Sequence, residues 1–141
     1  MQTVADIASL RKLFSATSTI IGCDTETTGL CYLKDHIVGL CLAGGKSYSK
    51  NDYCGFYLPV RHAGYPANLP LSEVLDLAQW VISNRTTFWW NRSFDFSFLE
   101  KEGVQMPFVG GSHDIQVMAH EVYNEKYPAL KDFAKRLFKF Q

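Results

Sequence analysis

The sequence has no excess of charge of either sign, and this absence restricts the partners that it can attract. Fourteen Lys and Arg residues balance fourteen Asp and Glu residues, so the formal net charge at pH 7 is zero. A protein without a net field does not concentrate nucleic acid or anionic membrane at long range. Any contact with nucleic acid must therefore come from a local site.

Long apolar runs and a secretory leader are also missing. The first residues lack the charged stretch and following apolar run that mark a signal peptide. No apolar run reaches the roughly 20 residues that a membrane-spanning helix needs. We therefore expect a cytoplasmic protein without a membrane partner.

Cysteine pairs with metal-binding spacing are absent as well. The four cysteines are Cys23, Cys31, Cys41 and Cys54, and none belongs to a C-x-x-C pair. Because they mostly lie at strand-like positions, we expect free thiols that act as small core residues in a reducing compartment, and no zinc site. The 141 residues are 47% hydrophobic and 20% charged, which is typical of one globular domain.

The most informative stretch is 19–30, which places two carboxylates at the end of an apolar strand. The β-prone residues at 20–23 predict a buried strand. Residues two apart on a strand share a face, so Asp24 and Glu26 should lie side by side. Two carboxylates this close repel each other unless a proton or a cation lies between them. The alternative is a strand end that carries two solvated acids.

The rest of the chain predicts an α/β domain with a mixed sheet. Apolar residues that recur at every third or fourth position predict helices at 3–14, 71–83, 115–123 and 130–138. The stretch 91–95 is expected to turn into a further helix that ends near Gly103. Thr3 is the expected N-cap of the first helix. After the first strand, further strands are expected at 37–43, 53–60, 86–90 and 107–109. Short connections make the first three strands an antiparallel meander, whereas the intervening helix makes the fourth strand parallel to the first.

Asp95 is a third acidic residue that this topology brings to the same place. It lies where the fourth strand passes into a helix, and the carboxyl ends of neighbouring parallel strands meet at one edge of a sheet. Asn91 would share a helical face with Asp95 if helical geometry already holds there. Three converging carboxylates favour Mg²⁺ or Mn²⁺. Two such ions about 4 Å apart would support phosphodiester hydrolysis.

Two motifs in this order resemble the first and second motifs of the DEDD-type 3′–5′ exonucleases. They are D-T-E at 24–26 and N-x-x-F-D at 91–95. Four further segments are similar to strands and later helices of the proofreading domain of bacterial- and phage-type family A DNA polymerases: 37–40, 56–62, 113–115 and 127–134. The resemblance covers nearly the whole chain.

The resemblance implies a single 3′–5′ exonuclease-like domain over residues 1–141. Its fold would be RNase H-like, with a mixed five-stranded sheet flanked by helices. Asp24, Glu26 and Asp95 would be the catalytic carboxylates and would bind Mg²⁺ or Mn²⁺ in a two-metal site.

The resemblance also implies a binding site for the 3′ end of single-stranded DNA. Leu30 would lie under the terminal base, and Thr27 and Asn91 would lie near the 3′-terminal nucleotide. Trp89 and Trp90 depart from the small or polar residues that the family carries just before Asn91. We expect these two rings to pack in the core, with base stacking as the alternative.

The third motif of the family does not occur in this sequence. In the family, a Tyr followed four residues later by Asp, or a His followed five later by Asp, supplies the last carboxylate. Tyr127 and Asp132 are five apart, which places them on different helical faces, and His120 with Glu125 offers a different acid. Asp114 begins a helix and is expected to be a cap. We therefore expect a domain that is incomplete at its C-terminus.

Together these features predict part of a metal-dependent, proofreading-type exonuclease that hydrolyses phosphodiester bonds at DNA 3′ ends. Alone it should have little or no activity, and a polymerase domain or a second polypeptide would supply the missing motif. The alternative is a degenerate, non-catalytic module of the same fold that binds nucleic acid or protein. An RNA-directed exonuclease of the same superfamily is a third reading, because the motifs bind the phosphate and do not read the sugar.

Overall fold

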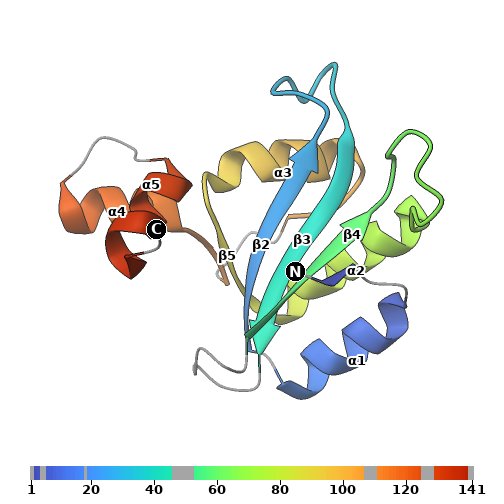
Figure 1. The fold of residues 1–141 in the computed structure, drawn as a ribbon, viewed down its shortest axis with the longest axis horizontal. Helices are drawn as coiled ribbons and strands as arrows, with labels where there is room; N and C mark the ends of the chain where they lie inside the picture. Colours follow the sequence, from blue (N-terminus) through green and yellow to red (C-terminus); the bar gives the residue numbers. More distant parts are fainter. Residues whose placement is uncertain are drawn as a thin grey trace.

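The computed structural model describes residues 2–3, 6–17, 19–45, 53–106, 111–124 and 129–139. These residues form one mixed sheet with strand order β1-β4-β3-β2-β5-β6, together with five helices (Figure 1). The strands are β1 Gln2–Thr3, β2 Ile20–Thr27, β3 Ile37–Gly45, β4 Tyr53–Pro59, β5 Thr86–Trp89 and β6 Ser112–Asp114. The helices are α1 Ile7–Thr17, α2 Leu71–Asn84, α3 Arg92–Lys101, α4 Ile115–Tyr123 and α5 Leu130–Phe138.

The order and direction of the central strands are those predicted from the connection lengths. Strands β2, β3 and β4 form an antiparallel meander, and β5 runs parallel to β2. The β2–β5 ladder pairs Ile20 with Thr86 and ends where Gly22 pairs with Phe88. The second half of β2, which carries both acids, therefore extends past its parallel neighbour.

The start of the chain differs from the prediction. Gln2 and Thr3 form β1, which pairs in parallel with β4, so Thr3 is not the N-cap of the first helix. Helix α1 begins at Ile7, and Asp6 caps it by accepting a hydrogen bond from the Ala8 amide at 3.0 Å. The partner of β1 is distant in sequence, so local periodicity could not reveal this two-residue strand.

The other edge of the sheet is formed by a strand at an unexpected place. Strand β6 pairs in parallel with β5, with Thr87 opposite Ser112 and Trp89 opposite Asp114. The sequence indicated these residues only as the start of a helix. The strand that was expected at 107–109 lies outside the described residues.

The hydrophobic core lies between the sheet and the helices behind it in Figure 1, which include α2 and α3. Along β2, the side chains of Ile21, Cys23 and Thr25 are buried and alternate with more exposed residues. The largest fully buried side chains include Phe14, Leu40, Leu58, Val81, Trp89 and Phe98. Burying one such side chain contributes about 1.5–3 kcal/mol, so the core fixes which face of β2 remains open.

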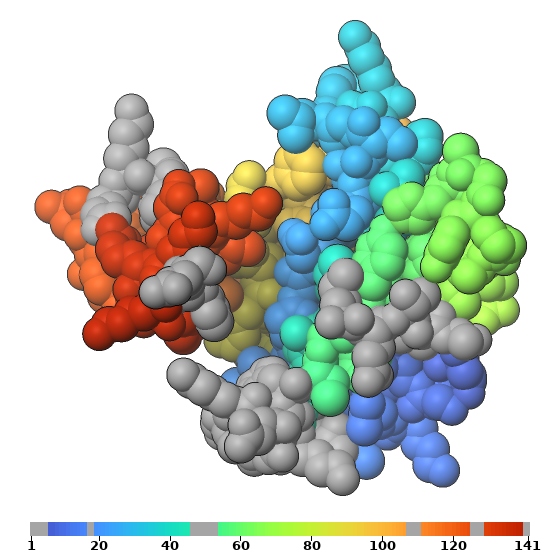
Figure 2. Space-filling view, in the orientation of Figure 1, coloured from blue at the N-terminus to red at the C-terminus, as the bar shows by residue number. Residues whose placement is uncertain are grey.

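Helices α4 and α5 lie beside the β5–β6 edge of the sheet (Figure 1). Phe133 of α5 is buried and contacts the rings of Trp90 and Tyr123, with ring centroids 5.4 and 5.5 Å away. Figure 2 shows β2, in blue, still visible between these helices and the neighbouring strands. None of the described helices is long and apolar enough to span a membrane.

The four cysteines are free thiols, but they are not all core residues. Cys23 is buried, Cys41 is half-buried, and Cys31 and Cys54 are exposed. The expectation of small core side chains is therefore wrong for three of them. Of these three, Cys41 lies on the open face of the sheet, where Asp24 also lies.

Candidate metal centre

Asp24 and Glu26 lie on the same face of β2, as the two-residue period predicts. Asp24 is half-buried and Glu26 is exposed. Cys23, which precedes Asp24, and Thr25, which lies between the two acids, are buried and point into the core. The register of β2 against β3 shifts between Glu26 and Thr27, which ends the regular ladder just after the second acid. The two carboxylates therefore stand at the open end of a strand whose other face is fixed by packing.

The electrostatics of this pair favour a cation. Burial and, to a smaller extent, the neighbouring charge of Glu26 together raise the pKa of Asp24 to about 6. Within the described residues the ion pair that forms is Arg61 with Glu102, and no Lys or Arg pairs with Asp24 or Glu26. Two adjacent carboxylates without a cationic partner fit a hard divalent ion by their chemistry.

Cys41 is a third potential ligand, which the sequence did not indicate. It pairs directly with Asp24 across the β2–β3 ladder, so its side chain lies on the same open face. The potential ligand atoms of Asp24, Glu26 and Cys41 all lie within 4.8 Å of one another. Burial and the nearby carboxylates raise the pKa of the Cys41 thiol to about 12. Only the cross-strand register, which a single sequence does not give, could have identified this residue.

Gly39 leaves room for an aromatic ring beside the same pair of acids. It lies directly opposite Glu26 on β3. A Cβ atom at this position would overlap the hydroxyl and ring of Tyr57, a β4 residue that pairs with Cys41. The Tyr57 hydroxyl in turn contacts the Nε2 atom of His62. The Tyr57 ring therefore packs over residue 39, next to Glu26, and this packing requires a glycine at position 39.

Asp95 lies next to the pair, but its carboxylate faces Thr25. It is only 1% exposed, and its Oδ1 atom accepts hydrogen bonds from the Thr25 amide at 2.8 Å and the Thr25 hydroxyl at 2.7 Å. The pKa of Asp95 is raised to about 7, because burial and the charge of Asp24 raise it by more than the Thr25 hydrogen bonds lower it. Asp95 does not belong to the compact group formed by the ligand atoms of Asp24, Glu26 and Cys41.

The expected helical face shared by Asn91 and Asp95 does not form. Asn91 precedes α3 in the left-handed conformation, with φ 61° and ψ 56°. Its side-chain oxygen accepts a hydrogen bond from the Ser93 hydroxyl at 3.1 Å. Asn91 is exposed at the start of α3, where it serves as the turn residue between strand and helix.

The turn after β2 presents an apolar tip beside the acids. Leu30 is 87% exposed, and Thr27 donates a hydrogen bond to the Gly29 carbonyl at 2.7 Å. Leu33 is also 72% exposed in the same turn. Leu30 is therefore exposed to a ligand, and Thr27 lies at the end of β2, bonded to the turn.

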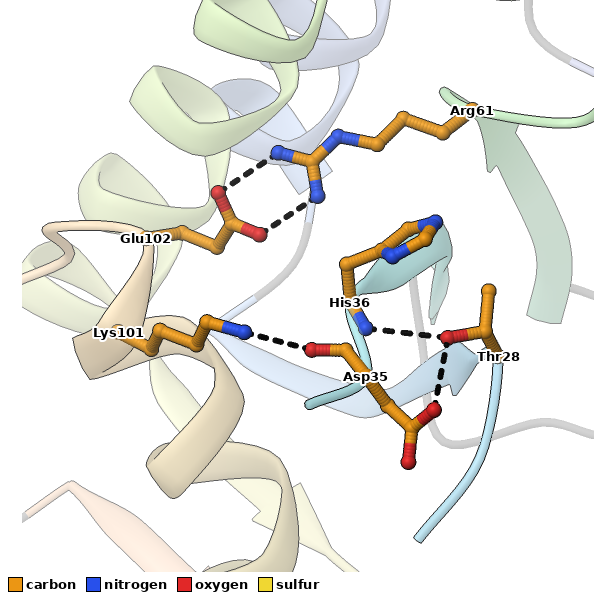
Figure 3. A network of polar contacts seen from close by, with 6 residues as sticks. All are labelled: Thr28, Asp35, His36, Arg61, Lys101 and Glu102. Carbon is orange, nitrogen blue, oxygen red and sulfur yellow. Dashed lines mark hydrogen bonds and ion pairs between the residues drawn. The ribbon is translucent and has the colours of Figure 1, made fainter. Parts of the chain in front are cut away.

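A polar network holds this turn against α3 (Figure 3). Asp35 accepts a hydrogen bond from the Thr28 hydroxyl at 3.2 Å, and its carbonyl accepts one from the Lys101 ammonium at 2.7 Å. Glu102, at the end of α3, accepts two hydrogen bonds from Arg61, at 2.6 and 2.8 Å. The Arg61–Glu102 ion pair joins the end of α3 to the segment after β4, whereas the bond from Lys101 to the Asp35 carbonyl joins α3 to the turn.

Asp114 and Asp132, the described acids that could replace the missing third motif, do not belong to the ligand group of Asp24, Glu26 and Cys41. Asp114 is the N-cap of α4, as expected, and accepts hydrogen bonds from the amides of Gln116 and Val117. It also accepts one from the Arg92 amide at 2.8 Å, so it joins the starts of two helices. Asp132 is exposed on α5. Tyr127 and Glu125 lie outside the described residues.

A groove of about 250 Å³ runs from Asp24 along the open face of the sheet. It is lined by small residues, including Gly22, Ala43 and Gly55, and by larger apolar ones, including Trp90 and Leu130. Both Trp89 and Trp90 line this groove. Trp89 is 1% exposed and donates a hydrogen bond to the Thr87 hydroxyl at 2.9 Å, so it packs in the core as expected.

Comparison with solved structures identifies the fold. The chain matches Brucella melitensis NrnC with bound Mg²⁺ at a TM-score of 0.63 and 15% identity, over 99% of this chain and 60% of that one. It matches the Aedes aegypti Nibbler EXO domain at a TM-score of 0.65 and 13% identity, over 95% and 66%. For S. pombe Pop2p in a form with Mg²⁺ and Mn²⁺ bound, the TM-score is 0.66 and the identity 14%, over 96% and 81%. No family model and no curated protein sequence matches the chain.

These similarities establish an RNase H-like fold. Identities of this size show the fold alone. The chain spans about 60% of the length of NrnC, so the activity of a complete nuclease does not follow from the match. The predicted fold is confirmed, while the roles of the individual acids stay predictions.

Proposed function

We propose that this chain supplies part of a divalent-cation-dependent 3′–5′ exonuclease site, with Asp24 and Glu26 as the principal cation-binding carboxylates. The observation that carries the proposal is the pair itself: two adjacent acids at an open strand end, with no cationic partner in the described part of the chain. The neighbouring folds solved with Mg²⁺ or with Mg²⁺ and Mn²⁺ support it.

In this proposal the residues of the chain have separate roles in binding the cation and the nucleotide. Asp24 and Glu26 hold the cation, and Asp95 positions them by binding the backbone of Thr25 between them. The exposed Leu30 offers an apolar surface to the terminal base, with Thr27 and Asn91 near the 3′-terminal nucleotide. A divalent cation bound there would supply Lewis-acid activation of water and neutralise charge on the scissile phosphate.

The proposal includes a weak or absent activity of the isolated chain. The Asp114 carboxylate accepts hydrogen bonds from backbone amides at the starts of α3 and α4, and Asp132 is exposed on α5. No fourth carboxylate therefore joins the acids within the described residues. A polymerase domain or another polypeptide would contribute it, and proofreading of DNA is the activity that the motif resemblance favours.

A non-catalytic module that binds single-stranded nucleic acid is the second candidate. The incomplete acid set favours it, and the groove beside Asp24, with Trp90 in its wall, offers an apolar surface for a base. The two candidates share the cation site but differ in whether a bond is cleaved. NrnC has also been solved bound to pGG, which supports a nucleic-acid ligand for this fold.

A single experiment tests the function. A 5′-labelled single-stranded DNA and the matching RNA are incubated with an excess of the chain in Mn²⁺, and both binding and strand shortening are followed. We expect Mn²⁺-dependent binding of the strand, with at most slow shortening from the 3′ end, and loss of both in Glu26→Gln. Binding and cleavage that are independent of Mn²⁺ and unchanged in Glu26→Gln would contradict the proposal.

A further inference from the structure

The ligand group found in the structure has a different composition from the one that the motifs suggest. Asp24, Glu26 and Cys41 place a sulfur and two carboxylate oxygens within 4.8 Å of one another. The register explains the third member, because Cys41 lies directly opposite Asp24 on the antiparallel strand β3. In such a pair the Cβ atoms lie about 4.5–5.5 Å apart, close enough for one ion to contact both side chains.

The three side chains are available to a ligand. No described residue donates a hydrogen bond to the carboxylates of Asp24 or Glu26, and none forms an ion pair with them. Asp95 differs, because one of its oxygens already accepts two hydrogen bonds from Thr25. One oxygen of Asp95 is therefore occupied by Thr25, and the third member of the ligand group is the Cys41 thiol.

We propose that Asp24, Glu26 and Cys41 form a mixed carboxylate–thiol site that binds Zn²⁺ more tightly than Mg²⁺ or Mn²⁺. Zinc in proteins is bound by sulfur, nitrogen and carboxylate oxygen, and its catalytic sites use three protein ligands with one open position. Magnesium and manganese prefer oxygen ligands, whereas a thiolate selects softer ions. Binding of Zn²⁺ would displace the Cys41 thiol proton to solvent, and the resulting thiolate changes the metal preference of the two carboxylates.

The inference rests on the proposed function, because it uses the same Asp24 and Glu26 carboxylates. It adds a regulatory consequence: Zn²⁺ excludes Mn²⁺ from these acids and opposes any Mn²⁺-dependent reaction. The cysteine spacing alone gave no reason to expect zinc, because the other ligands are acids brought together by strand pairing.

The test uses Cd²⁺ as a thiolate-specific probe of the site. One equivalent of Cd²⁺ is added to the full chain, and the ultraviolet thiolate-to-metal absorption is recorded for the unmodified protein, Cys41→Ser and Cys54→Ser. Cys54 is exposed and lies outside the ligand group, so its variant is the matched control. We expect the band in the unmodified protein and in Cys54→Ser, and its loss in Cys41→Ser.

Calorimetric titration with Zn²⁺ gives a second readout. Removing one ligand should weaken Zn²⁺ binding at least about tenfold in Cys41→Ser and in Cys41→Ala, with a much smaller effect on Mn²⁺. Circular dichroism checks that both variants fold, and the alanine variant replaces the serine variant if the latter does not.

The outcomes separate this inference from the proposed function. A Cd²⁺ band of equal strength in Cys41→Ser, or equal Zn²⁺ affinity in both Cys41 variants, overturns the zinc site while leaving the Mn²⁺ site of Asp24 and Glu26 intact. Failure of Mn²⁺ binding to depend on Asp24 would instead overturn the proposed function. Loss of the Cd²⁺ band in Cys54→Ser as well would also contradict the zinc site.

Discussion

Asp95 accepts two hydrogen bonds from Thr25, the residue that lies between the two acids of β2. The bonds come from the amide at 2.8 Å and from the hydroxyl at 2.7 Å, and both end on the same carboxylate oxygen. They form just past the point where the β2–β5 ladder ends at Gly22 and Phe88. Asp95 thus accepts the hydrogen bond of the Thr25 amide, which has no partner on β5 because the ladder has already ended.

Removing the Thr25 hydroxyl should weaken this connection. Thr25→Val keeps the side-chain shape, but of the two hydrogen bonds only the one from the backbone amide of residue 25 to Asp95 remains. We therefore expect the free energy of unfolding to fall by about 1–3 kcal/mol. Urea denaturation measures it. Thr86→Val on β5 is the control, because no side-chain hydrogen bond of Thr86 is seen; its change should stay within about 0.5 kcal/mol. Equal losses in the two variants would contradict the role of the hydroxyl.

The stability of the cation-free protein should decrease as the pH rises from about 4 to 7. Asp24 and Asp95 have pKa values raised from 3.8 to about 6 and about 7 in the folded protein, so they keep protons that the unfolded chain has already released. Stability is then greatest below the unfolded pKa and is lost as the pH rises through the folded values. Unfolding curves in chelator at several pH values measure this slope.

Asp95→Asn tests which residue produces the slope. The amide oxygen still accepts from Thr25 but no longer titrates, so we expect a flatter dependence of stability on pH than in the unmodified protein. Asp132→Asn, at an exposed position on α5, is the control and should keep the original slope. A slope that is unchanged in Asp95→Asn would show that its carboxyl is not held protonated by the fold.

Gly39 should be the glycine of the open face that is least tolerant of a side chain. In Gly39→Ala the new Cβ displaces the Tyr57 ring, and we expect a loss of about 1–3 kcal/mol in unfolding free energy. At Gly22 a Cβ would meet the Ala43 side chain at an ordinary 3.7 Å, so Gly22→Ala is the matched control. If Tyr57 is the cause, Gly39→Ala in a Tyr57→Ala background should cost much less; an undiminished cost would exclude this explanation.

The sequence was sufficient for the features that depend on local patterns. The alternation at 20–26 predicted that Asp24 and Glu26 share a face, and the apolar period at 71–83 predicted α2. Connection lengths then gave the meander and the parallel fourth strand. These features depend on side-chain period and chain reach, which a single sequence contains.

The features that the sequence did not give depend on pairing between distant segments. Cys41 enters the site through the β2–β3 register, and Thr3 becomes a strand residue through its pairing with β4. Asp95 turns to Thr25 because a strand ladder ends nearby. Asn91 adopts a left-handed conformation, so the spacing of four to Asp95 does not place them on one helical face. Tertiary register decides each of these, and local periodicity cannot.

The central claim is that Asp24 and Glu26 form a divalent-cation site, and calorimetric titration with Mn²⁺ tests it most directly. The unmodified chain, Asp24→Ala, Glu26→Ala and the surface control Asp132→Ala are titrated under the same conditions. We expect measurable Mn²⁺ binding in the unmodified chain and in Asp132→Ala, and its loss in both β2 variants. Identical titration curves for the unmodified chain and Asp24→Ala would contradict the account.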